Sequence, residues 1–264
     1  MVGRPHRRPR WWSRDRGAGG ARHRTAGAAG DGAAAVRRRH FALHVTDDDQ
    51  GRHLRARWRE KGGTEGRLDA TVLLPAGHES LNVVIPWDDR RFQYTSKHQG
   101  RPASGELVVG DRAWDLDGGW GVLDVGRGRW PYRTRWNWGG GAGRASSADR
   151  IVGLQLGGRW TEGTGFTENG VIVDGVLTKI GRELRWDYDW DAPLKPWRVE
   201  DPGGQLRLEL VPRYDKHTRI EAVVMGTETH QVFGTWSGTV TTDEGDTVVL
   251  DGIQGFAEES RSRW

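Results

Sequence analysis

The sequence contains no cysteine, so disulfide bonds and thiolate chemistry are excluded for this chain. No apolar run approaches the roughly 20 residues that a membrane-spanning helix needs. The basic N-terminus also lacks the apolar segment of a signal peptide. From these absences we expect a cytoplasmic protein without a membrane span.

Helical periodicity is missing as well, because no segment repeats apolar residues at the helical spacing over a full helix length. Instead, runs such as RLDATVLL, SLNVVIPW and QLRLELVP are separated by turn-forming segments such as KGGTEG and PAGHE. Leu206, Leu208 and Leu210 alternate with Arg207 and Glu209, which is typical of a strand with one buried face. The expected fold class is therefore all-β, an antiparallel barrel or sandwich.

Positive charge is concentrated in residues 1–40. This segment contains 11 Arg, 2 Asp and no Lys, a charge of +9, whereas the whole chain carries only +4. The rest of the chain is therefore net acidic, which argues against nucleic-acid binding by the folded part. Residues 1–40 have too few apolar side chains to offset the entropy lost on ordering, so we expect a disordered tail. Residues 41–264 are expected to form the β domain or domains, with a lobe boundary near 140–150.

Tryptophan is abundant, with 15 residues, and the segment WGVLDVGRGRWPYRTRWNW concentrates it. Side chains alternate across an extended strand, so the second half of this ribbon has two different faces. One face is aromatic and carries Trp130, Tyr132, Trp136 and Trp138. The other face is cationic and amide-bearing and carries Arg133, Arg135 and Asn137.

Either face of the ribbon could line a cavity. The aromatic face would hold a planar or lipophilic ligand by area and stacking. The arginine face would instead bind a carboxylate or phosphate, which matches the guanidinium fork. The alternative is that the aromatic residues are core and the arginines are solvated or salt-bridged. Alternation alone does not decide which face meets a cavity.

Three residues are candidates for proton transfer. Asp124 lies in the first half of the ribbon, before its aromatic part and close to several arginines, which would keep its carboxylate ionised. Glu168 and Asn169 end the segment TEGTGFTEN, where glycines let the backbone approach a ligand, and a carboxyl group in a dry pocket would act as a general acid. His230 opens the strand HQVFGTW and could transfer protons at neutral pH. Each also has a structural interpretation, as a turn acid or a hydrogen-bonded strand residue.

No motif for a metal or a cofactor is present. There is no His-x-His, no HExxH and no Asp-x-Asp-x-Asp-Gly calcium loop. The glycine-rich segments GRGRW and GGGAGR lie between expected strands with no helix to follow, so they are poor phosphate cradles. We expect no metal and no cofactor.

Several long segments point to a family. These are LNVVIPWDDRRFQYTSKHQGRPASGEL, LDVGRGRWPYRTRWNWG, GLQLGGRWTEGTGFTENGVIVDG and HQVFGTWSGTV with DGIQGFAEESRSRW. From Leu81 onward, the chain resembles the bacterial family named domain of unknown function 2804. The resemblance implies a two-lobed, lipocalin-like architecture of the calycin group, with carotenoid hydratases and tocopherol cyclases as distant relatives. It does not extend to residues 1–40, which implies an incomplete first lobe.

The favoured function is binding of a lipophilic or partly anionic small molecule in a Trp-lined cavity. The distant relatives imply acid–base addition, cyclisation or isomerisation. Two alternatives stay open. One is carbohydrate binding or hydrolysis, with Asp187 and Asp189 as paired carboxylates. The other is nucleic-acid binding through the basic tail and Trp stacking. The missing secretion signal counts against the first alternative, and the acidic folded part counts against the second.

Overall fold

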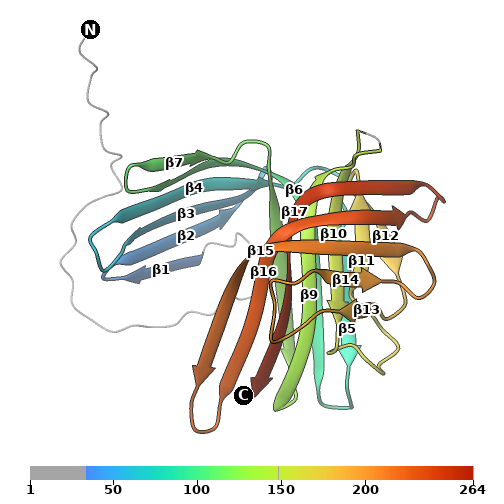
Figure 1. Cartoon of the computed structure of the whole chain (residues 1–264). Helices are drawn as coiled ribbons and strands as arrows, with labels where there is room; N and C mark the ends of the chain where they lie inside the picture. The colour runs from blue at the N-terminus through green and yellow to red at the C-terminus, as the bar shows by residue number, and fades with distance from the viewer. Residues whose placement is uncertain (1–33, 148, 264) are drawn as a thin grey trace.

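The structure is a computed structural model that describes residues 34–147 and 149–263. Every regular element in these residues is a β-strand, and all strand pairs are antiparallel. The strands form two curled sheets, which Figure 1 shows in blue to green and in yellow-green to red. The expected all-β fold with two lobes is thereby confirmed. The described residues contain no helix that is long and apolar enough to cross a membrane.

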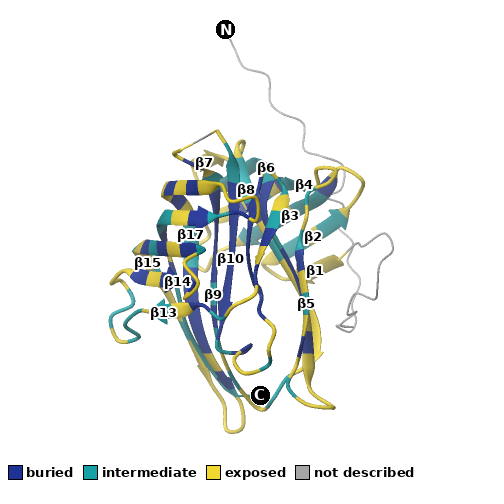
Figure 2. Ribbon diagram, turned by 90° about the vertical axis from the view of Figure 1, so that its right-hand side faces the viewer, coloured by how far each residue is buried: buried dark blue, intermediate teal, exposed yellow. Residues whose placement is uncertain are grey.

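The first sheet has eight strands in the order β1-β2-β3-β4-β6-β5, with β7 and β8 also paired to β6. Their bounds are β1 Ala34–Arg38, β2 Phe41–Asp47, β3 Gly51–Arg59, β4 Glu65–Leu73, β5 Leu81–Pro86, β6 Phe92–Val109, β7 Arg112–Asp115 and β8 Gly119–Arg129. The long strand β6 pairs with β5 through its first part and with β4 through its last part. All of β1 is exposed, as its yellow colour in Figure 2 shows, and its outer edge pairs with no other described strand.

The second sheet has nine strands in the order β12-β11-β10-β9-β17-β16-β15-β14-β13. Their bounds are β9 Arg133–Arg144, β10 Ile151–Gly158, β11 Asn169–Val173, β12 Val176–Ile180, β13 Arg185–Asp187, β14 Trp197–Glu200, β15 Leu206–Glu221, β16 Gly226–Thr241 and β17 Thr247–Arg263. Strand β10, largely dark blue in Figure 2, is buried along almost its whole length, and β9 is buried from Gly139 to Ala142.

The turn between β11 and β12 illustrates how the sequence directs a hairpin. Asp174 and Gly175 both have positive φ, 51° and 88°. This is the left-handed backbone that two-residue hairpins favour and that Asp-Gly adopts readily. The pairing of Val173 with Val176 confirms the hairpin expected from these two residues.

The main hydrophobic core lies inside the curl of the second sheet. Leu206, Leu208 and Leu210 are buried there, as their alternation with charged residues predicts. Trp197 and Trp236 are fully buried in the same core, and each indole N–H donates to a main-chain carbonyl. Two large indoles thus enter the core without leaving a polar atom unpaired.

The two sheets meet where β6 lies against β9 and β10. Gly153 of β10 lies so close to β6 that a Cβ built on it would be 2.9 Å from backbone atoms of Gln99 and Gly100. Gly100 has a φ of 68° and sits at a bulge that shifts the register of β6 between His98 and Arg101. The main chain of β10 therefore packs directly on the main chain of β6 at this point. Side chains of the neighbouring positions fill the layer between the two sheets.

Two expected boundaries differ from the structure. Residues 34–38 were expected in the disordered tail but form β1, because a tight hairpin pairs them with β2. The remaining tail, residues 1–33, lies outside the described residues. The chain passes from the first sheet to the second over residues 130–132, before the expected lobe boundary near 140–150. That region holds the end of β9 and its connection to β10, and these two strands pair within the second sheet.

Candidate functional site

The two stripes of strand β9 face two different interior spaces. Trp138 lies toward the first sheet, where the Lys97 ammonium stands 4.4 Å from its ring centroid. Asn137 faces the curl of the second sheet, where its amide donates to the Tyr188 hydroxyl at 3.0 Å. Arg135 shares the Asn137 side of the strand and forms an ion pair with Glu259. The aromatic and cationic stripes therefore cannot line one common cavity across the strand.

Residues 130–132 form a connection rather than the start of the strand, so the expected extended ribbon is shorter than predicted. Its proline cannot donate to a ladder, which suits a turn. Trp130 still joins the aromatic stripe, since its ring centroid is 5.9 Å from that of Trp136. Tyr132 does not: it is 52% exposed, and its hydroxyl donates to the Val224 carbonyl at 2.8 Å.

Tryptophans from both sheets gather in the layer between them, namely Trp87, Trp130, Trp136, Trp138 and Trp160. The Trp130 ring centroid lies 5.0 Å from that of Trp87 and 5.4 Å from that of Trp160. The Trp87 indole donates to the Trp160 carbonyl at 2.8 Å and so ties the sheets together. All except Trp160 are only partly buried. The cluster therefore presents accessible aromatic surface.

A buried lysine lies beside the tryptophans. Lys97 Nζ is 2.8 Å from Asp124 Oδ2 and 3.3 Å from Glu168 Oε2. The side chains of Lys97 and Glu168 are only 7% and 2% exposed, whereas that of Asp124 is 37% exposed. The Thr95 hydroxyl donates to Asp124, and the Trp160 indole donates to Glu168. Three distant segments, β6, β8 and the residue before β11, thus share one charge cluster.

Burial sets the proton affinities in this cluster. It raises the pKa of the Glu168 carboxyl group, against the opposing attraction of Lys97. Burial also penalises the Lys97 ammonium, but the attraction of Glu168 and Asp124 outweighs it and raises the pKa of Lys97. Nearby, burial raises the pKa of Glu258, although the Trp136 indole donates to it. The site thus combines a stable ammonium with two carboxyl groups, those of Glu168 and Glu258, that retain protons more readily than usual.

Asn169 follows Glu168 directly, but its amide is engaged by the main chain. The Gly157 N–H donates to its Oδ1 at 2.6 Å, and its Nδ2 donates to the Arg182 carbonyl at 3.0 Å. Asn169 therefore fixes the beginning of β11 and, with it, the position of Glu168.

His230 is not brought together with Asp124 and Glu168. Strand pairing aligns His230 with Glu259, and Glu259 with Asn137, so its side chain lies on the cationic side of the second sheet. The three candidate proton carriers are therefore divided between the two faces of this sheet.

The sequence alone did not point to Lys97 or Glu258. Lys97 belongs to a row of alternating polar residues on β6 that all contact the layer between the sheets: Gln93, Thr95, Lys97 and Gln99. A polar row in a strand ordinarily indicates a solvated face. One sequence signal could have revealed this. Both faces of the strand are polar here, since Ser96 and His98 alternate with the row, and only one face of a strand at the surface needs to meet water.

The chain matches the profile of a family described as Domain of unknown function (DUF2804) over residues 18–264. The chain belongs to this family. The matched region begins well upstream of Leu81, so it includes part of the basic segment 1–40, to which the resemblance seen in the motifs did not extend. The family description assigns no activity, and no curated protein matches the chain.

Two solved structures are similar to the chain at a low level. A crystal structure of CghA with Sch210972 has 13% identity and a TM-score of 0.29, covering 84% of this chain and 74% of that chain. A crystal structure of CghA has 14% identity and a TM-score of 0.28, with the same coverage. Similarity at this level assigns no role to any residue of the DUF2804 chain.

Proposed function

We propose that the protein binds a lipophilic small molecule against the tryptophans between its two sheets, with Lys97 meeting an oxygen atom of that molecule. The observation that carries the proposal is the buried Lys97 ammonium, which lies over Trp138 and is held by Asp124 and Glu168. Accessible indole faces suit an apolar ligand. An ammonium that is shielded from water is a strong hydrogen-bond donor to the ligand's polar end.

The chemistry of this site suits an acid–base step on the bound molecule. A fixed ammonium stabilises negative charge that develops on a carbonyl or hydroxyl oxygen during addition, cyclisation or isomerisation. Asp124 and Glu168 position Lys97. Because Glu168 is only 2% exposed, it acts by holding the Lys97 ammonium in place rather than by contacting a ligand.

The carboxylates required for the carbohydrate alternative have structural partners. Asp187 lies 3.8 Å from Arg198, and Asp189 lies 2.8 Å from Lys195. Both line an open cavity of about 500 Å³. These ion pairs favour a structural role for the two aspartates, so we retain the lipophilic ligand as the proposed class.

The test is a titration of tryptophan fluorescence with all-trans-retinol. We expect saturable quenching, and we expect Trp138→Leu to weaken the affinity about tenfold, because the ligand loses one large aromatic contact. Trp114→Leu is the matched control, because Trp114 lies on β7 and contacts Arg112 rather than the cluster. Circular dichroism melting checks that both variants are folded.

Absence of saturable retinol quenching would contradict the proposal, as would equal affinities of the wild type and Trp138→Leu. Saturable quenching by cello-oligosaccharides, without a response to retinol, would instead support carbohydrate binding.

A further inference from the structure

Four arginines meet on the face of the second sheet that is opposite the tryptophan cluster. Arg133 and Arg135 of β9 are directly paired with Arg263 and Arg261 of β17. Like charges that face each other across a strand pair destabilise a sheet. Two such pairs in succession therefore require negative charge nearby.

The arginines line an open cavity of about 320 Å³ at one end of the sheet. The cavity lies where the ends of β9 and β17 meet the turn between β15 and β16. Its other lining residues are Thr134, Glu221, Gly226, Thr227, Glu228 and Ser262.

The carboxylates of the protein satisfy only part of this positive charge. Arg135 and Arg261 share the buried Glu259, and Arg263 pairs with Glu221 at 2.6 Å. Among the residues that the structure describes, the Arg133 side chain has no hydrogen-bond or ion-pair partner. One guanidinium fork is therefore left open in the cavity.

The surrounding residues keep the face cationic. Arg219 adds a fifth guanidinium, 3.9 Å from Glu228. At this end of the face, five guanidinium groups thus lie beside the carboxylates of Glu221, Glu228 and Glu259. The next carboxylate along the same face, Asp215, bonds His230. Arg261 also lies 3.6 Å from the Trp190 ring centroid, which holds it in place.

We propose that this cavity binds the carboxylate or phosphate group of a small molecule, with Arg133 as the principal contact. Guanidinium groups recognise these planar or multi-oxygen anions through paired hydrogen bonds. The four arginines and the tryptophan cluster lie on opposite faces of β9. The anion site therefore goes beyond the proposed function, and the two proposals are tested independently.

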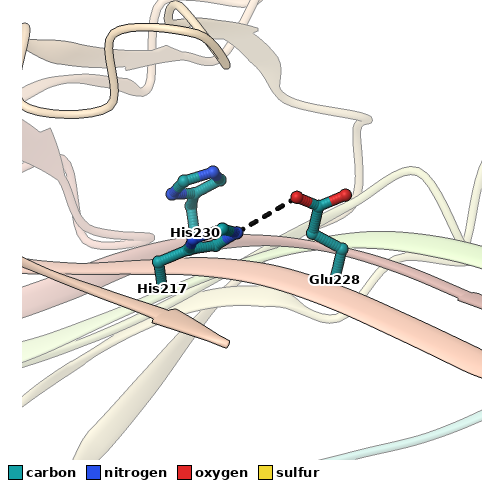
Figure 3. A group of neighbouring side chains, drawn as sticks. All are labelled: His217, Glu228 and His230. Atoms are coloured by element: carbon teal, nitrogen blue, oxygen red, sulfur yellow. Dashed lines mark hydrogen bonds and ion pairs between the residues drawn. The ribbon is translucent and has the colours of Figure 1, made fainter. Parts of the chain in front are cut away.

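Two histidines and a glutamate on the same face could in principle bind a metal cation instead of an anion. His217, Glu228 and His230 have ligand atoms within 4.8 Å of one another. Figure 3 shows these three side chains gathered together. The two imidazole rings, however, stack in parallel with centroids 4.2 Å apart. Lone pairs in two parallel ring planes do not converge on one ion. His230 also bonds Asp215 at 2.8 Å, and the five guanidinium groups nearby repel cations.

The test measures the binding of inorganic phosphate and, separately, of acetate by isothermal titration calorimetry at constant ionic strength. We expect Arg133→Gln to weaken binding of the preferred anion about tenfold, because one charged contact is lost. Arg144→Gln is the matched control: it removes an exposed arginine of the same strand that pairs with Asp149, and we expect unchanged affinity. Preference for phosphate or acetate distinguishes the two ligand classes.

A second variant separates an anion site from a cation site. Glu228→Gln removes one negative charge, so phosphate or acetate should bind more tightly. Saturable binding of Zn²⁺ that Glu228→Gln abolishes would identify a cation site and overturn the proposal. No saturable binding of either anion would also overturn it, as would equal effects of Arg133→Gln and Arg144→Gln in variants whose thermal unfolding matches the wild type.

Discussion

The imidazole of His98 lies on the face of β6 opposite Lys97, among polar and cationic side chains. Its Nε2 lies 2.9 Å from the Ser96 hydroxyl, and its Nδ1 lies 2.5 Å from Arg101. Burial, followed by the charges of Arg101 and Arg52, lowers the pKa of His98 to about 4. His98 therefore binds a proton at a lower pH in the folded protein than in the unfolded chain.

We expect His98→Gln to flatten the acid dependence of stability. As the pH falls from 6.5 to about 4, the unfolded chain binds a proton at His98 before the folded protein does. The free energy of unfolding of the wild type therefore decreases through this window, whereas the contribution is complete above it. Urea unfolding at several pH values in this range measures the slope. A slope equal to that of the wild type would contradict the account, and the exposed His44→Gln serves as control.

The residue scale also shows how far the sequence could predict the site. Alternation separated Trp136 and Trp138 from Arg135 correctly, because β9 is extended over those positions. Glu168 was recognised as a candidate acid, but Lys97 was missed. Their contact depends on how β6 packs against the second sheet, and a pattern along one strand holds no information about that packing.

At the scale of elements, the contact between β6 and β10 depends on a missing side chain. A Cβ at Gly153 would lie 2.9 Å from backbone atoms of Gln99 and Gly100, and the backbone cannot move aside as a flexible side chain would. We expect Gly153→Ala to lower the free energy of unfolding by about 1–3 kcal/mol through overpacking. Gly181→Ala is the control, since nothing lies within 4 Å of its added Cβ. Urea denaturation should separate the two variants; equal stabilities would disprove the close contact.

The elements that the sequence did not predict have identifiable physical reasons. Strand β1, with the sequence AAVRR, is exposed at every position, so it lacks the alternation by which buried strands are recognised. It exists because β2 supplies its hydrogen bonds. The connection 130–132 breaks an otherwise regular pattern, because a proline stands where the chain changes sheets. The Asp-Gly hairpin was predictable because its backbone geometry is local.

At the scale of the whole molecule, turn spacing and alternation were sufficient to predict antiparallel strands in a barrel or sandwich, and the two lobes were expected from the family resemblance. They could not show that β9 separates two interior spaces, one facing the first sheet and one inside the second. Both stripes of the ribbon therefore face an interior space, but not the same one. The aromatic stripe belongs to the proposed lipophilic site, and the cationic stripe belongs to the proposed anion site.

The most direct test of this division follows the indole N–H signals of the ¹⁵N-labelled protein by NMR. Titration with all-trans-retinol should shift the signals of Trp136 and Trp138 and leave that of Trp190 unchanged. Titration with inorganic phosphate should shift Trp190, because Arg261 lies 3.6 Å from its ring centroid, and leave the other two unchanged. If both ligands shift the same signals, or neither shifts any of the three, the account of two separate sites on one strand is wrong.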